Sequence, residues 1–252
     1  MKNYHFLKIL ILFIFFFQNI QSQENKCIYA KYSFRNKNNN TLNDVSLYIN
    51  KQEAYSVFLD YEIKKDSMFE DDFGNIKINL KNNDSIGKQY YLTNKNITFR
   101  DHIYTEGNLI PVIVNESMPS FNWKLETDTL TINNYLCNKA NLDFRGRNYT
   151  FWYTIEIPTQ FGPWKFFGLP GLIVKIESED KSISFQLNKL ELTDNNNIEK
   201  PKLGKQISFK EYVIFQEKIT DDFIEKLKTK LPRGSSMKVN KTERTSIEKN
   251  YD

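Results

Sequence analysis

Apolar and polar residues alternate along most of this chain, which is the pattern of half-buried β-strands. In the first such segment Ile28, Ala30, Tyr32 and Phe34 alternate with Tyr29, Lys31, Ser33 and Arg35. Further strand candidates are residues 45–49, 55–61, 90–93, 97–100, 110–114 and 121–125, the segments "LTINNYLC" and "KANLDF", and "SISFQL". Asparagine-rich stretches such as "NKNNN" and "DNNNIEK" separate them and indicate loops. We therefore expect a mainly β protein with a curved antiparallel sheet, either a meander or a half-barrel.

The alternation is densest over residues 149–157. One face of this predicted strand carries Tyr149, Phe151, Tyr153, Ile155 and Ile157, and the other carries Thr150, Trp152, Thr154 and Glu156. Trp152 is the only large apolar residue on the polar face, so it either covers a neighbouring strand or belongs to a binding surface. Pro158 is expected to end the strand, because proline cannot donate a hydrogen bond to the ladder.

The stretch "GPWKFFGLPGLIVKI", residues 162–176, contains two proline–glycine pairs around an aromatic core. Leu169-Pro170-Gly171-Leu172 fits a type II turn, in which proline fixes φ at the second position and glycine supplies a positive φ at the third. The apolar alternation then resumes at Leu172. We expect a strand, a stiff turn and another strand here. No Gly-Lys-Ser or Gly-Lys-Thr follows the glycines, which excludes a phosphate-binding loop.

The hydrophobic period changes from two to about 3.6 towards the C-terminus. Ser208 and Glu211 form a capping box that opens one helix. Thr220 precedes the apolar face of a second helix, so we expect a pair of helices packed against the sheet. From residue 237 the chain is polar and charged, which is typical of a flexible tail. The expected domain organisation is a single β-rich domain over residues 23–236 and a polar flexible tail over residues 237–252.

The N-terminus has the three-part form of a secretory signal peptide, predicted over residues 1–22. Lys2 and Lys8 precede an apolar run over residues 9–17, and a polar stretch with Ser22 follows. This run is shorter than the roughly 20 apolar residues of a membrane-spanning helix, and no longer one follows. The sequence therefore predicts an exported protein without a transmembrane segment, located in the periplasm, in the outer envelope or outside the cell.

The charge balance gives no support for nucleic-acid binding. The chain has 35 Lys and Arg against 31 Asp and Glu, whereas nucleic-acid binders concentrate basic residues on one face. Two cysteines, Cys27 and Cys137, follow the predicted signal peptide. An even number of cysteines in an exported chain favours a disulfide between them. The alternative is two buried free thiols.

The segment "FRGRNYTFWYTIEIPTQFGPWKFFGLPGLIVKI" resembles the GLPGLI family of exported bacterial proteins, whose hexapeptide is present here as residues 168–173. The resemblance includes the Gly-Arg-x-Tyr, Trp-Tyr-Thr, Glu-Ile-Pro and Gly-Pro-Trp-Lys-Phe elements. Upstream, "YLCNKA" is similar to the family's Gly-Tyr-x-Cys-x-Lys-Ala segment, with Asn134 in the place of its glycine. The resemblance implies a signal peptide, an envelope or secreted location and a β-rich fold. It implies no activity.

The inventory of reactive residues predicts neither a catalytic nor a metal site. His102 is the only histidine after the predicted cleavage point, whereas zinc sites use several His or Cys ligands. No Gly-x-Ser-x-Gly nucleophile elbow is present. We therefore expect no cofactor.

Four charged residues lie within the most aromatic region of the sequence: Arg145, Arg147, Glu156 and Lys165. They form either outward cross-strand pairs and cation–π contacts or the lining of a groove suited to apolar ligands with an anionic head. The candidate binding or motif residues are Arg145, Arg147, Trp152, Tyr153, Glu156, Trp164, Lys165, Gly168, Pro170 and Gly171.

We expect a non-enzymatic exported binding protein, for an apolar ligand or for another envelope protein. The alternatives are an exported hydrolase with an unrecognised site and a structural or adhesive surface component.

Overall fold

A computed structural model describes residues 26–37, 41–59, 67–70, 76–79, 84–106, 108–194, 197–229 and 246–251. The predicted signal peptide lies outside these residues. The strands are β1 (Cys27–Asn36), β2 (Thr41–Ile49), β3 (Glu53–Phe58), β4 (Ser67–Glu70), β5 (Ile76–Asn79), β6 (Lys88–Thr93), β7 (Asn96–Thr105), β8 (Asn108–Ser117), β9 (Lys124–Ile132), β10 (Tyr135–Phe144), β11 (Arg147–Thr154), β12 (Leu172–Ser178), β13 (Ile183–Thr193) and β14 (Lys205–Ser208). The helix is α2 (Phe209–Thr229). Within the described part of the chain, no helix is long and apolar enough to cross a membrane.

Twelve strands form one sheet in the order β14-β8-β7-β6-β3-β2-β1-β13-β12-β11-β10-β9, while β4 and β5 form a separate hairpin. The sheet consists of two meanders that meet where β1 pairs with β13. The prediction of a mainly β fold is confirmed. The sheet is mixed instead of purely antiparallel, because β14 returns from a long connection and pairs in parallel with β8.

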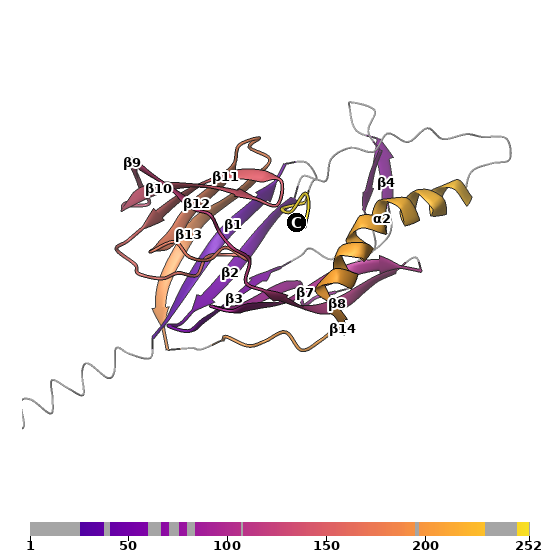
Figure 1. The fold of residues 1–252 in the computed structure, drawn as a ribbon, viewed down its shortest axis with the longest axis horizontal. Coiled ribbons are helices and arrows are strands. Elements are labelled where there is room, and N and C mark those ends of the chain that lie inside the picture. The colour runs from indigo at the N-terminus through magenta and orange to yellow at the C-terminus, as the bar shows by residue number, and fades with distance from the viewer. Residues whose placement is uncertain are drawn as a thin grey trace, which may run out of the picture.

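The sheet curls so strongly that its two halves face each other, which Figure 1 shows as β9–β13 lying over β3, β7 and β8. The length of one connection requires this curvature. The strands β8 and β9 stand ten positions apart in the strand order, which would be about 48 Å in a flat sheet. The connection between them, residues 118–123, reaches at most about 25 Å when fully extended.

The core lies between the two halves and is filled by the chain's own side chains. Each strand contributes the inward half of its alternation, as Ala30, Tyr32 and Phe34 do from β1. The connection between β11 and β12 adds Trp164 and Phe166, both almost completely buried. The aromatic stretch that the sequence analysis assigned to a turn region is therefore part of the core.

The structure corrects the expectation of a strand, a stiff turn and a strand in this region. The strand β11 ends at Thr154, three residues before the predicted end, and Ile155 is 62% exposed. Residues 155–171 then form a long connection that enters the interior. Its only pair of bridged residues is Phe161 with Phe167, so the aromatic residues of the stretch serve packing and form no ladder.

The glycine requirement in the hexapeptide also differs from the prediction. Positive φ occurs at Gly168, where φ is 102°, and Gly171 is not among the residues with positive φ. Gly171 is needed for another reason, since a Cβ at this position would lie 2.1 Å from the carbonyl oxygen of Thr154. The predicted type II turn is wrong, and close backbone approach explains the glycine.

The predicted pair of helices is a single helix, α2, which packs against β7, β8 and β14. No glycine or proline occurs between residues 209 and 229, so nothing interrupts the helix near Thr220. The capping box is confirmed, because the backbone N–H of Glu211 donates to Ser208 Oγ and that of Ser208 donates to the Glu211 carboxylate.

The predicted disulfide is absent, and Cys27 and Cys137 are both buried thiols that are not bonded to each other. Cys27 is on β1 and Cys137 is on β10, four positions away in the strand order. The two residues also belong to separate hydrophobic clusters. A disulfide requires Cα atoms within about 7 Å, a distance that this topology does not provide. Burial raises the pKa of both thiols above the usual range.

Candidate functional site: a buried carboxylate site

The last six described residues, 246–251, lie between the two halves of the sheet, near the end labelled C in Figure 1. We call them the C-terminal segment. Glu248, in this segment, is only 7% exposed. The sequence analysis assigned these residues to a flexible tail, whereas the structure holds them in place. The rest of that predicted tail lies outside the described residues.

Four charged side chains meet around Glu248 and form what we call the carboxylate site: Glu116, Arg145, Lys165 and Glu248. Glu116 points inward from β8, Arg145 lies in the turn between β10 and β11, and Lys165 lies in the connection between β11 and β12. Each of the four side chains is less than a tenth exposed. Residues that are far apart in the sequence are therefore brought together at a buried point.

Local backbone geometry positions the two cations. Arg145 and Gly146 have φ values of 47° and 76° and form a two-residue turn between the paired residues Phe144 and Arg147, as expected of a type I′ hairpin. Lys165 follows Trp164, whose φ is 62°. A tight loop closes there, since the backbone N–H of Gly162 donates to the Phe166 carbonyl over 2.9 Å.

The cations bind both carboxylates. Lys165 Nζ lies 2.9 Å from Glu116 Oε2 and 3.1 Å from Glu248 Oε1. The Arg145 guanidinium donates through Nη2 to Glu116 and through Nη1 to Glu248. Aromatic rings also pack against the cations, and Lys165 Nζ lies 4.2 Å from the centre of the Phe99 ring. Such cation–π contacts compensate in part for the loss of water around a buried charge.

The charge balance of the site depends on the C-terminal segment. The sheet and its connections supply Arg145, Lys165 and Glu116, which together carry a net charge of +1. Glu248 supplies the anion that makes the site neutral. Burial by itself lowers the pKa of Arg145, but the charges of Glu248 and Glu116 outweigh it and raise the pKa above its usual value. A buried excess charge is costly, so the fixed part of the site requires an anionic partner.

The main chain of the segment is bound as well. The backbone N–H groups of Lys249 and Asn250 point to the Arg145 carbonyl, at 3.0 and 3.3 Å. Arg147 Nε donates to the Ser246 carbonyl over 3.0 Å, and the Tyr149 hydroxyl donates to the Ile247 carbonyl over 2.8 Å. The site therefore binds the main chain of the segment in addition to its carboxylate.

Arg147 is fixed from the other side by the turn between β12 and β13. Its Nη1 donates to Asp180 Oδ2 over 2.7 Å and to Ser182 Oγ over 2.9 Å. Burial raises the pKa of Asp180, but hydrogen bonds from Ser178 and Ser182 and the charge of Arg147 outweigh this and hold it well below its usual value. Arg147 Nη2 is buried and has no hydrogen-bond partner among the described residues.

Of the residues proposed from the sequence, Arg145, Arg147, Trp164 and Lys165 lie together at this site. Tyr153 is buried in the core. Trp152 is half-buried on the opposite face, across from Lys139 and Lys175. Glu156 lies elsewhere and accepts a hydrogen bond from the backbone of Leu136.

Three residues of the hexapeptide, Gly168, Pro170 and Gly171, lie in the connection between β11 and β12. Gly168 leaves room for Trp123, whose indole nitrogen would lie 3.2 Å from an added Cβ. Pro170 is exposed. Gly171 permits the close approach of β11 described above. These three residues shape the connection that carries Lys165. In the described part of the chain, the side chain of Glu248 is bound by Arg145 and Lys165 instead.

Sequence reasoning missed Glu116 and Glu248. Glu116 follows Val112 and Val114 at the same alternation and therefore shares their inward face, a signal that was available. Glu248 lies in a polar stretch without any periodic pattern, so its burial had no sequence signal. The described residues contain no cluster of three or more His, Cys, Asp or Glu side chains arranged to hold a metal ion.

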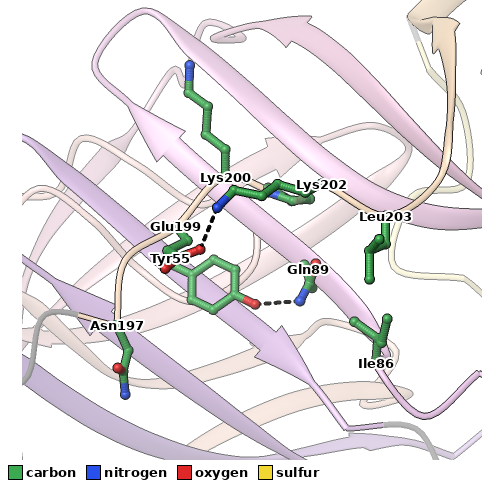
Figure 2. A pocket seen from close by; sticks show the side chains of 9 residues that line it. Tyr55, Ile86, Gln89, Asn197, Glu199, Lys200, Lys202 and Leu203 are labelled. Carbon is green, nitrogen blue, oxygen red and sulfur yellow. Dashed lines mark hydrogen bonds and ion pairs between the residues drawn. The ribbon is translucent and has the colours of Figure 1, made fainter.

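A surface hollow of about 490 Å³ lies away from the carboxylate site, on the outer side of β3 and β6, beneath residues 197–203. Figure 2 shows the Tyr55 hydroxyl accepting a hydrogen bond from Gln89 and Lys202 paired with Glu199. Burial raises the pKa of Tyr55 to about 12. None of the residues proposed from the sequence lines this hollow, so the carboxylate site is the better candidate.

Residues 145–175 match the model of a protein family described as "Protein of unknown function (Porph_ging)". This region contains both cations of the carboxylate site, Arg145 and Lys165, and also Arg147, which binds the main chain of the C-terminal segment. A comparison with curated proteins found no significant match.

The chain is similar in fold to solved structures of PNGF-II. The match to the P21 crystal form has a TM-score of 0.51 and 14% identity, covering 80% of this chain and 34% of that one. The C2 form gives a TM-score of 0.51, 12% identity and coverage of 77% and 33%. An uncharacterised conserved protein from Thermus thermophilus gives a TM-score of 0.39 and 12% identity, with coverage of 76% and 98%. The chain thus spans about a third of the PNGF-II chains, and at this identity the likeness concerns the fold alone.

Proposed function

We propose that this chain is an exported, non-enzymatic binding protein whose ligand is a segment of another envelope protein, bound at the carboxylate site. One observation supports this most directly. The fixed part of the site has a net charge of +1 and aims hydrogen-bond donors at a backbone, and it is completed by a segment that belongs to no strand or helix. This is the recognition expected of a peptide-binding site.

The filled interior favours a protein ligand over an apolar small molecule. Pockets for apolar ligands are concave and lined mainly by apolar side chains. Here Trp164, Phe166 and Phe151 occupy the space between the two halves of the sheet, and ring contacts connect them. The proposed export rests on the predicted signal peptide and on the resemblance to exported proteins.

Site-specific photo-crosslinking tests the proposal in the organism that makes the protein. A photoreactive residue replaces Asp143, which is exposed on β10 two positions before Arg145. In the control it replaces Leu192, which is 69% exposed near the far end of β13. The expected result is a crosslink from position 143, and not from position 192, to one exported protein. Native mass spectrometry of the purified chain is expected to show no lipid adduct. A stoichiometric lipid without a position-specific crosslink would refute the proposal and favour an apolar ligand.

A further inference from the structure

The C-terminal segment shows which features of a peptide the carboxylate site can distinguish. Ile247 packs against the core, and Glu248 enters the carboxylate site. The ring of Tyr251 packs on two aromatic residues of α2, with its centroid 6.2 Å from that of Phe209 and 6.0 Å from that of Tyr212. Asn250 is exposed. The spacing is therefore an apolar residue, a glutamate, two residues that lie against Gly146, and an aromatic residue.

Arg147 shows that this segment leaves part of the site unused. A guanidinium presents Nε and one terminal nitrogen side by side, and a carboxylate can accept from both at once. Arg147 Nε donates to the Ser246 carbonyl, whereas the buried Nη2 has no partner among the described residues. A carboxylate side chain in the place of Ser246 would supply the missing acceptor.

Resting on the proposed function, we infer that the ligand is a segment of a partner protein with an acidic residue, an apolar residue and a glutamate in succession, and an aromatic residue three positions after the glutamate. The C-terminal segment occupies the site until such a ligand displaces it. A second copy of this chain would offer serine at the first position and would leave Arg147 Nη2 unsatisfied in the same way. The geometry therefore favours a different partner.

The C-terminal segment competes with an external peptide for the carboxylate site. A segment tethered within the same molecule acts at an effective concentration on the order of millimolar. An external peptide must overcome this, so weakening the internal segment should strengthen peptide binding. Glu248→Gln removes the internal carboxylate charge and leaves the fixed part of the site intact. Glu217→Gln, at an exposed position of α2, is the matched control.

Fluorescence anisotropy with labelled peptides tests the inference on the full chain. The peptides are Asp-Ile-Glu-Lys-Asn-Tyr, the native Ser-Ile-Glu-Lys-Asn-Tyr, and Asp-Ile-Gln-Lys-Asn-Tyr. We expect the first to bind the Glu248→Gln chain at least about tenfold more tightly than the Glu217→Gln chain. We expect the native peptide to bind about tenfold more weakly than the first, because one charge-assisted hydrogen bond is lost. The Gln peptide should bind about a hundredfold more weakly than the first.

The inference is overturned if the three peptides bind equally, or if none binds while hydrogen exchange shows that residues 246–251 of Glu248→Gln are released. If Glu248→Gln does not fold, Tyr251→Ala weakens the segment without altering the buried charges, and the same order of affinities is expected. Concentration-dependent dimers of the unmodified chain that disappear in Glu248→Gln would identify a second copy as the occupant and refute a different partner. Absent peptide binding with an intact crosslink from position 143 would refute the peptide motif alone and leave the proposed function standing.

Discussion

The carboxylate site can be tested by a double-mutant cycle on Lys165 and Glu248, whose charged atoms lie 3.1 Å apart. Lys165→Met leaves Arg145 to balance two carboxylates, and Glu248→Gln leaves one carboxylate for two cations. Each single change thus creates a buried excess charge, which costs about 3 kcal/mol or more when one partner of a buried pair is removed. The double variant retains the neutral pair of Arg145 and Glu116.

The double variant should therefore be destabilised by clearly less than the sum of the single variants. Coupling between closely paired, desolvated charges is about 1.5 kcal/mol or more, so we expect a coupling of at least that size between Lys165 and Glu248. The measurement is urea denaturation of the four proteins. With an m-value of about 3 kcal/mol per M for a chain of this size, each single variant should lower the midpoint by about 1 M. Strictly additive effects, with coupling below about 0.5 kcal/mol, would show that the two residues do not share a site.

Three further predictions concern the fold. Gly171→Ala should lower the free energy of unfolding by about 3 kcal/mol, because its Cβ would lie 2.1 Å from the Thr154 carbonyl oxygen. A urea denaturation midpoint equal to that of the unmodified chain would contradict this close approach. Alkylation after unfolding without a reductant should label both Cys27 and Cys137, and an unlabelled pair in the mass spectrum would mean that a disulfide forms after all. Burial raises the pKa of Tyr149 far above its ordinary value of 10, so its contribution to stability is complete below pH 10 and is lost as the pH rises above it, by up to about 1.4 kcal/mol per pH unit. Alkaline titration followed by circular dichroism tests this, and in Tyr149→Phe the loss of stability above pH 10 should be smaller.

The hydrophobic alternation was sufficient to predict a β protein and the approximate position of most strands. Local interactions decide such features, because a strand with one buried face must place apolar residues at every second position. The start of α2 was also predictable, since Ser208 and Glu211 form their hydrogen bonds within one helical turn. Arg145, Arg147 and Lys165 were singled out as charges in the most aromatic region of the sequence, and the structure places them close together.

The order of the strands in the sheet could not be predicted from local sequence patterns. The wrong predictions for the cysteines and for Gly171 result from this. The disulfide was expected from the cysteine count, but four positions in the strand order separate Cys27 from Cys137. Gly171 was assigned to a turn, whereas its role comes from Thr154, which lies seventeen residues earlier and packs against it. In each case the decisive neighbour is distant in the sequence.

The carboxylate site shows the same division most clearly. The sequence by itself determined that two cations lie in an aromatic region and that Glu116 shares the face of its apolar neighbours on β8. Only the tertiary structure decided that these charges meet and that Glu248 closes the site. The physical reason is that a buried charge must find a compensating partner in three dimensions, and the chain satisfies this requirement with a residue 83 positions away from Lys165.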